Sequence, residues 1–254
     1  MTKAALTVAA PDPRARRTRA ADRWARAETR LRMIGTFDLT VDGYSVELPM
    51  SVQRLLAFLA LQDRPLLRSQ VAGVLWPETT DERAAANLRS ALWKLRRSEQ
   101  GIIDATTATL RLADRVGVDV REVNATAHRL LAPDAVLTFA DFDASRFTLD
   151  LLPDWYDDWL VMERERFHQL RLRVLEMLCD RMVAAGSFVH AVELGLAAVA
   201  GEPLRESAHR ALVRVHQAEG NRAEALRQFE LYRRLLEDHL GMAPSAQMLE
   251  LVSD

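Results

Sequence analysis

The sequence contains a single cysteine, Cys179, among 254 residues, and this scarcity excludes two classes of protein. One thiol cannot build a disulfide framework within the chain, and it cannot supply a cysteine-based zinc site. We expect Cys179 to be a small buried residue at a tight helix-packing position, and the lack of disulfides fits a reducing cytosol.

Long apolar runs and enzyme motifs are also missing. No run is long enough to span a bilayer, and the N-terminus has no apolar signal core, so we expect no membrane partner and a cytoplasmic, nucleoid-associated location. The chain has no G-x-x-x-x-G-K-[ST], G-x-G-x-x-G, H-E-x-x-H or G-x-S-x-G motif and no receiver domain. We therefore expect no enzyme activity, no cofactor and no metal. The histidines without metal-ligand spacing are His190, His209, His216 and His239.

Charge of one sign does not dominate the chain. Lys and Arg number 34 and Asp and Glu number 36, which gives a net charge of −2. The chain as a whole is thus no basic nucleic-acid binder, and any DNA contact must come from a local patch. Hydrophobic residues make up 49%, which is typical of a globular protein, and the length favours two domains.

Residues 1–30 are predicted to form a basic, flexible tail. Arginines outnumber acids there, and Pro11 and Pro13 disfavour an early helix. The tail can be a basic arm on DNA or a disordered to partly helical extension, and we favour the extension.

The stretch from Thr79 to Arg97 is predicted to form one amphipathic helix. Thr79 and Glu82 match a capping box, and Leu88 and Leu95 belong to an apolar face with three- and four-residue spacing. The opposite face carries basic or hydrogen-bonding side chains: Arg89, Ser90, Trp93 and Arg97, with Asn87 and Lys94 along one edge. No acidic residue follows Arg83 in this helix. Solvated basic helices usually include Glu for ion pairs, so an acid-free face favours a phosphate-lined groove over a plain solvent-exposed surface.

Short elements flank this helix in a recognisable order. Three strands are predicted at residues 31–34, 37–41 and 45–48, with Asp42-Gly43 as a hairpin signal. Helices follow at residues 53–61 and 69–75, and Trp76-Pro77 stops the second. After the basic helix, residues 102–103 and 109–112 are β-like runs around a Thr-rich turn. Strands, three helices and a hairpin form the order of a winged helix-turn-helix, whose third helix enters the major groove.

The segment from Leu31 to Val120 resembles the OmpR-type winged-helix domain of the Streptomyces antibiotic regulatory protein family. The resemblance is carried by L-R-M-I-G-T-F-D-L-T-V-D-G, Q-R-L-L-A-F-L-A-L, V-A-G-V-L-W-P, A-A-A-N-L-R-S-A-L-W-K-L-R-R and V-D-V-R-E-V. Two departures concern backbone contacts and capping. No lysine stands at residues 50–52 before the first helix, and Leu67 occupies the usual polar cap of the second.

The C-terminal half is predicted to be helical and to contain a repeat. Gly186 and Gly220 are 34 residues apart, as are Ala191 and Ala225, which is the tetratricopeptide period. With Phe229, Ala225 reproduces the A-x₃-F pair. Trp155, Trp159 and Met162 are predicted core residues, and the acidic, aromatic connector around Asp141 and Asp143 is expected to be solvated or packed. The segment A-E-G-N-R-A-E-A-L-R-Q-F-E-L-Y-R-R-L-L-E-D-H-L-G-M-A-P-S resembles the bacterial transcriptional activator domain of the same family.

The fold class expected from these resemblances is an α+β winged helix-turn-helix of OmpR type, followed by an all-α tetratricopeptide-like domain. Residues 31–122 would form the first domain and residues 123–254 the second. The resemblance implies a transcriptional activator for a secondary-metabolite gene cluster, with double-stranded DNA carrying direct repeats as its target. It also implies two copies on DNA and contact with RNA polymerase holoenzyme, including the sigma factor.

Site residues follow from the residue types and from this resemblance. Candidate DNA contacts are Arg83, Asn87, Arg89, Ser90, Trp93, Lys94, Arg96, Arg97, Thr107 and Thr109. The loop similar in place to the polymerase-contacting loop contains Trp76, Glu78, Thr79, Asp81 and Glu82. Trp93 is equally well interpreted as a wedge against DNA or as a packing residue, and each wing threonine can simply reflect β-propensity. The alternative function is a protein-interaction scaffold whose winged helix is structural.

Overall fold

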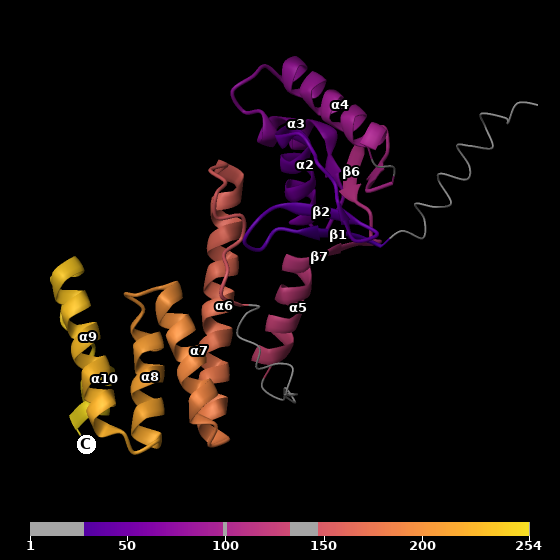
Figure 1. Cartoon of the computed structure of the whole chain (residues 1–254). Coiled ribbons are helices and arrows are strands. Elements are labelled where there is room, and N and C mark those ends of the chain that lie inside the picture. Colours follow the sequence, from indigo (N-terminus) through magenta and orange to yellow (C-terminus); the bar gives the residue numbers. More distant parts are fainter. Residues whose placement is uncertain (1–27, 99–100, 133–146, 254) are drawn as a thin grey trace, which may run out of the picture. The chain divides into compact units, whose positions relative to one another are not determined.

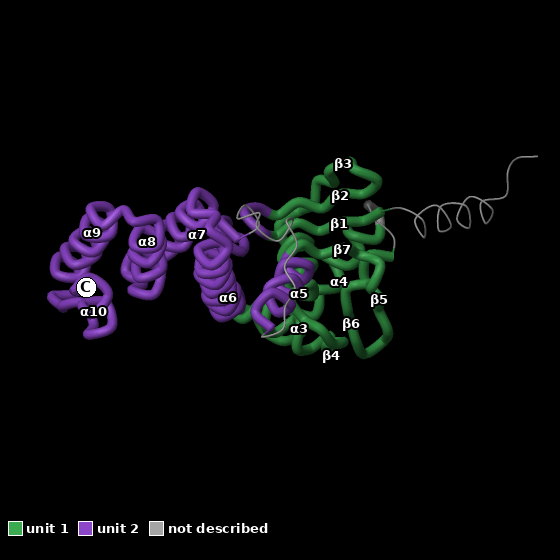
Figure 2. The backbone as a smooth tube through the Cα atoms, turned by 90° about the horizontal axis from the view of Figure 1, so that it is seen from below, with its two compact units in different colours: residues 1–33, 37–119 green, residues 34–36, 120–254 purple. Residues whose placement is uncertain are grey.

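The computed structural model describes residues 28–98, 101–132 and 147–253. Contacts between Cα atoms divide the chain into two compact units, one of residues 1–33 with 37–119 and one of residues 34–36 with 120–254, which Figure 2 colours separately. The first unit is mixed α/β and the second is helical. Each is described by itself.

A four-stranded sheet opens the first unit. Its strands are β1 (Thr29–Arg32), β2 (Asp38–Val41), β3 (Tyr44–Ser45) and β7 (Val116–Val118), in the order β3-β2-β1-β7. The predicted hairpin is confirmed, because Val41 pairs with Tyr44 across a two-residue turn in which Asp42 and Gly43 have φ angles of 50° and 81°. Strand β7 pairs in parallel with β1 and was not predicted. Strand β1 begins at Thr29, at the end of the predicted tail, and the first 27 residues of that tail lie outside the described residues.

Three helices and a second sheet complete this unit. The helices are α2 (Met50–Ala60), α3 (Arg68–Leu75) and α4 (Asp81–Ser98), and Figure 1 shows them beside one another. The sheet has the order β4-β6-β5, with β4 (Leu66–Leu67), β5 (Ile103–Ala105) and β6 (Thr109–Leu112). The β5–β6 hairpin matches the predicted one, whereas β4 was not predicted. Leu67 is the N-cap of α3 and makes no side-chain cap hydrogen bond, as its residue type predicted.

The second unit is built from α5 (Asp119–Leu131), α6 (Asp158–Ala184), α7 (Phe188–Gly201), α8 (Glu206–Ala218), α9 (Arg222–Leu240) and α10 (Ala246–Ser253). Helices α6 to α9 lie side by side and alternate in direction (Figure 1). One apolar cluster forms around Leu175, Leu194 and Ala211, and a second forms around Phe229 and Met248.

The 34-residue repeat has a counterpart in the backbone. Gly186 and Gly220 each lie two residues after the end of α6 and α8. Their φ angles are 72° and 81°, a conformation that glycine adopts without steric cost. One residue later the same hydrogen bond closes each turn: Ser187 N donates to Met182 O at 2.9 Å, and Asn221 N donates to His216 O at 2.8 Å. Both helix pairs therefore turn through the same Schellman-type motif.

One predicted core assignment is wrong and one group of predictions is untested. Met162 is 61% exposed, although Trp155 is buried. Among the four histidines without metal-ligand spacing, His209 is fully buried, and its ring contacts Pro203 O and the side-chain amide of Gln228. The acidic, aromatic connector at residues 133–146 lies outside the described residues.

Candidate nucleic-acid interface

Helix α4 presents one face to the core of its unit and the opposite face to solvent. The buried stripe packs on α2 and α3 and consists of Ala84, Leu88, Ala91, Leu92 and Leu95. The exposed residues include six of the predicted contacts: Arg83, Arg89, Ser90, Trp93, Lys94 and Arg96. Asn87 is half-buried at the edge of this face, and the side chain of Arg97 lies outside the described residues. The prediction that this face of the helix points to solvent is thus confirmed for the described side chains.

The N-terminus of α4 differs from the predicted capping box by one residue. The helix begins at Asp81, and Thr80 is the cap, because its carbonyl accepts from Ala84 N at 2.8 Å and its hydroxyl accepts from Arg83 N at 3.4 Å. Thr79 instead donates its hydroxyl to Trp76 O at 3.1 Å. With Thr80 as the cap, the third helical residue is Arg83 rather than a glutamate, so a reciprocal capping box cannot form.

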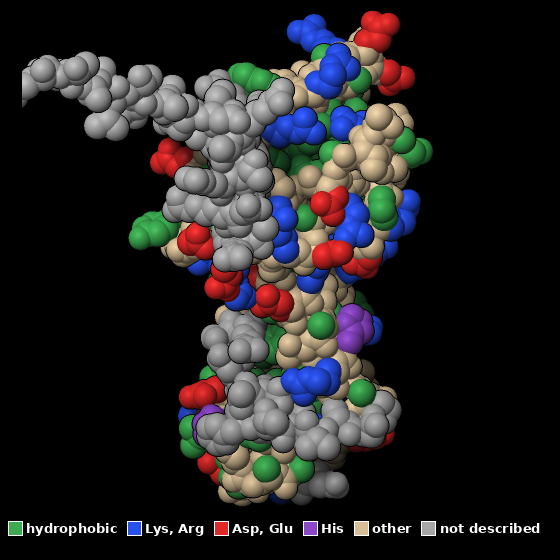
Figure 3. All heavy atoms as spheres, turned by 90° about the vertical axis from the view of Figure 1, so that its right-hand side faces the viewer, with side chains coloured by type: hydrophobic (Ala, Val, Ile, Leu, Met, Phe, Trp, Pro, Cys, Tyr) green, Lys and Arg blue, Asp and Glu red, His purple; other side chains and the backbone are tan. Residues whose placement is uncertain are grey.

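The solvent-facing side of α4 is cationic. Among the described residues, no hydrogen bond or ion pair engages the guanidinium groups of Arg83, Arg89 and Arg96. Figure 3 shows Lys and Arg side chains at the height that α4 has in Figure 1, with Asp and Glu side chains beside the uppermost of them. Asp81 and Glu82 confine negative charge to the first turn of α4, where it stabilises the helix dipole.

The β5–β6 hairpin is less cationic than its sequence suggests. Arg111, its one arginine, forms ion pairs with Asp104 at 3.5 Å and with Asp114. At the turn, the hydroxyls of Thr106 and Thr109 lie 2.9 Å apart, and Thr106 Oγ1 accepts from Thr109 N at 2.9 Å. Thr107 is exposed, so it remains the hairpin threonine best placed to meet a partner.

A groove of about 820 Å³ is lined by residues of α3 and of the first half of α4. Arg68 and Arg89 line it together with Asp81 and Glu82, over a floor of small residues that includes Gly73. The predicted polymerase-contact residues border this region: Trp76 is the half-buried C-cap of α3, Glu78 is exposed, and Thr79 is half-buried. The groove is thus lined by both acidic and basic side chains, with the acids coming from the first turn of α4.

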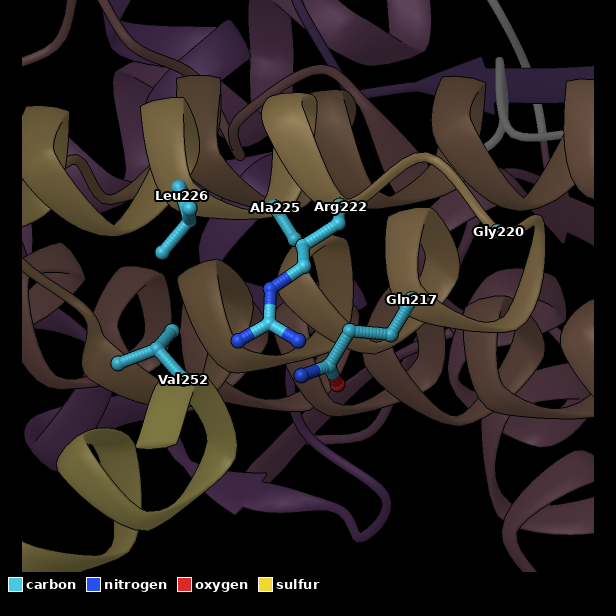
Figure 4. Close-up of a pocket in the computed structure, with 6 residues that line it drawn as sticks. All are labelled: Gln217, Gly220, Arg222, Ala225, Leu226 and Val252. Atoms are coloured by element: carbon cyan, nitrogen blue, oxygen red, sulfur yellow. The ribbon is translucent and has the colours of Figure 1, made fainter. Parts of the chain in front are cut away.

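A smaller hollow of about 220 Å³ lies between α8, α9 and α10 in the second unit. In Figure 4 the guanidinium of Arg222 extends beside the side-chain amide of Gln217, while Leu226 and Val252 lie at the apolar end. Within the described residues, no group of three His, Cys, Asp or Glu side chains is placed to hold a metal ion. No described helix is both long enough and apolar enough to cross a membrane.

Cys179 and His209 are buried side chains of the second unit with shifted pKa values. Burial raises the pKa of the Cys179 thiol to about 12, and its Sγ donates to Ala191 O at 3.2 Å. Burial also lowers the pKa of His209. A protonated thiol and a neutral, hydrogen-bonded imidazole in the interior are packing residues, as predicted for Cys179.

One residue of the basic face was missed from the sequence. Ala86 is exposed, and at about 100° per residue it lies within about 10° of the direction opposite the buried stripe. A helical projection of the sequence could have found it, but an alanine carries no charge or hydrogen-bonding group to draw notice.

Comparison with known proteins shows that this chain is similar to bacterial regulatory proteins. Residues 142–253 match the family model of the bacterial transcriptional activator domain. The regulatory protein AfsR of Streptomyces griseus is 27% identical over 218 residues, which cover 80% of this chain and 22% of AfsR. AfsR of Streptomyces coelicolor is 27% identical over 220 residues, which cover 80% and 21%. The chain thus spans about a fifth of the length of these relatives.

A solved structure shares the fold. EmbR of Mycobacterium tuberculosis, determined in complex with a low-affinity phosphopeptide, matches with a TM-score of 0.69 over 89% of this chain and 64% of the EmbR chain. The sequence identity is 19%, so the likeness concerns the arrangement of a small sheet-containing unit followed by helices.

Proposed function

We propose that this chain, whose residues 142–253 match the bacterial transcriptional activator domain, is a sequence-specific DNA-binding activator of the Streptomyces antibiotic regulatory protein type. In this proposal the first unit is a winged helix-turn-helix, with α4 as the recognition helix and the β5–β6 hairpin as the wing. The family consists of transcriptional regulators rather than enzymes, and no catalytic role is assigned.

The observation that supports this most strongly is the solvent face of α4. From Arg83 to Ser98 the helix has no acidic residue, its apolar stripe is buried, and three described arginines on its outer side have no partner among the described residues. Guanidinium groups on an exposed helix suit both phosphates and guanine edges. A scaffold helix of the same composition would be expected to pair its arginines with acids on its own surface, as α9 pairs Arg227 with Glu224.

Roles are proposed by side-chain type. Arg89 and Lys94 reach guanine edges, and Asn87 reaches an adenine or a phosphate. Arg96 and Arg97 grip phosphates and so give affinity without sequence information, with Arg83 and the hairpin residues Thr107 and Thr109 in supporting backbone contacts. Trp93 is 57% exposed, which favours contact with a sugar or a thymine methyl over a purely packing role.

Larger-scale partners belong to the same proposal. Two copies bind direct repeats upstream of a promoter, and the loop of Trp76, Glu78, Thr79, Asp81 and Glu82 contacts RNA polymerase holoenzyme and its sigma factor. Exposed carboxylates in this loop are poor DNA ligands but suit a basic protein surface. We place the boundary between DNA-binding and activator domains at residues 122–123, the site of action at the nucleoid, and the target in a secondary-metabolite gene cluster.

A selection and a salt titration test the proposal. The chain is mixed with a random-sequence duplex library, and enriched duplexes are measured by electrophoretic shift at several salt concentrations. We expect direct repeats to be enriched, with log affinity falling by about 0.9 per phosphate contact for each unit of log salt. Arg89→Ala should relax preference at one base pair at a cost of about 1–3 kcal/mol, whereas Arg96→Ala should weaken all sequences alike and lower the salt slope.

Arg227→Ala is the matched control, because Arg227 is an exposed arginine of α9 with 72% of its side chain accessible. It removes the same charge from the chain and should leave both affinity and base preference unchanged. If wild type enriched no sequence and gave no shift at low salt, the DNA-binding proposal would be wrong, and the protein-interaction scaffold would take its place.

A further inference from the structure

We propose that Ala86, supported by Ser90, determines sequence specificity by contacting the C5-methyl group of a thymine in the major groove. This inference rests on the proposed DNA-binding function and names two residues that discriminate between bases at that site. It concerns the centre of the exposed face of α4, whereas Arg83, Arg89 and Lys94 occupy its flanks.

The position of Ala86 follows from the burial pattern of α4. The five buried residues of the stripe point in one mean direction, and Ala86 points almost directly away from it. Ser90 follows one helical turn later on the same face and is also exposed. Any flat or concave surface that meets the outer side of α4 therefore meets Ala86 and Ser90 at its middle.

These two side chains are the shortest on the exposed face, and they are surrounded by long ones. Arg83, Arg89 and Lys94 flank them on the neighbouring rows of the helix, and Trp93 follows Ala86 two turns later on the same side. A short centre lets the helix backbone approach the floor of the groove, while the long flanking residues reach outward to base edges and phosphates. A large side chain at position 86 would hold the whole helix away from the bases.

The side chains of Ala86 and Ser90 determine which groups of the bases the centre of the exposed face can contact. Ala86 offers only a methyl group, which makes favourable contact with an apolar group and leaves a polar base edge without a hydrogen bond. The thymine methyl is the apolar group that base pairs present in the major groove. The Ser90 hydroxyl can donate to an acceptor on an adjacent base, so the pair favours a step that contains thymine.

Replacement of single thymines by deoxyuridine tests this contact, because it removes only the methyl group. The probe is a duplex that wild type selects from a random-sequence library. We expect one position in each bound copy at which deoxyuridine lowers wild-type affinity about fourfold, the value for one buried methyl-sized group. In Ala86→Gly the same replacement should have no effect, and Ala86→Ser, which retains a Cβ, should shift base preference at that position.

Two controls separate the inference from the proposed function. Ala223→Gly alters an exposed alanine of α9 by the same substitution and should preserve the deoxyuridine effect. Ala86→Leu should reduce affinity for the selected duplex at least tenfold without a lower salt slope. If wild type enriched a sequence but no deoxyuridine effect depended on Ala86, this inference alone would be overturned. If wild type enriched no sequence, the proposed function and this inference would both be overturned.

Discussion

Substituting alanine for glycine at two helical positions should have opposite effects on stability. Gly195 lies in α7 where an added Cβ would be 2.5 Å from Leu212 Cδ2, 2.8 Å from Leu212 Cγ and 3.5 Å from Cys179 Sγ. Gly73 lies in α3, and a Cβ there would meet nothing within 4 Å. Comparison of the two positions separates backbone entropy from packing.

The magnitudes follow from two terms. In a helix interior alanine is more favourable than glycine by about 0.8–1.0 kcal/mol, and this gain is available at both positions. At Gly195 the gain is opposed by overpacking, which costs about 1–3 kcal/mol because Leu212 is fully buried and has little room to move. We expect Gly73→Ala to raise the free energy of unfolding by about 0.8–1 kcal/mol and Gly195→Ala to lower it by up to about 2 kcal/mol.

Urea unfolding followed by far-ultraviolet circular dichroism measures both variants, and amide hydrogen exchange assigns each effect to its own unit. The double variant Gly195→Ala/Leu212→Ala should show a favourable coupling energy, because the shorter side chain relieves the clash. Stabilisation by Gly195→Ala equal to that by Gly73→Ala would refute the close packing of α7 on α8.

Three further predictions concern single side chains. Burial raises the pKa of Glu206, but hydrogen bonds from Ser245 and the nearby Arg210 outweigh it, so its pKa falls below the usual 4.5. A lowered carboxyl pKa stabilises the fold above the unfolded value, so Glu206→Gln should cost about 1–3 kcal/mol at neutral pH, and urea unfolding should show this deficit vanishing in acid. A deficit independent of pH would contradict it. Because burial raises the pKa of Cys179 to about 12, mass spectrometry should detect its alkylation only after unfolding, whereas alkylation in the native state would contradict its burial. Thermal unfolding should show that Thr80→Ala costs about 1 kcal/mol through the lost cap and that Thr80→Ser does not, and an equal loss would contradict the cap.

Elements with a long periodic signal were predictable from the sequence. Helix α4 has a three- and four-residue apolar pattern over its whole length, and the glycine turns after α6 and α8 recur with a fixed period. The strands that escaped prediction are short and depend on distant partners. β4 has two residues and pairs with β6, and the three-residue β7 pairs in parallel with β1 from far along the chain. Such pairings are set by tertiary context rather than by local propensity.

In the candidate site, too, some residues were predictable from local sequence and others depended on tertiary contacts. Arg89 and Arg96 were found because charge on one helical face is visible in a projection, and the structure leaves both exposed. The ion pairs of Arg111 with Asp104 and Asp114 join residues on both strands of a hairpin and the turn after it, so the sequence alone did not show that this charge is already neutralised. Ala86 was missed for another reason, because it carries no charge or hydrogen-bonding group that would single it out in a projection.

Hydrogen bonds join the β5–β6 hairpin to the start of α3. β4 precedes α3 directly and pairs with β6, and Arg68 donates its amide to Ala108 O at 2.9 Å and its Nε to Thr106 O at 3.0 Å. The hairpin is therefore joined to α3 by a ladder of hydrogen bonds, and α3 in turn packs along α4. We expect that a partner which displaces the hairpin would also affect the position of α4.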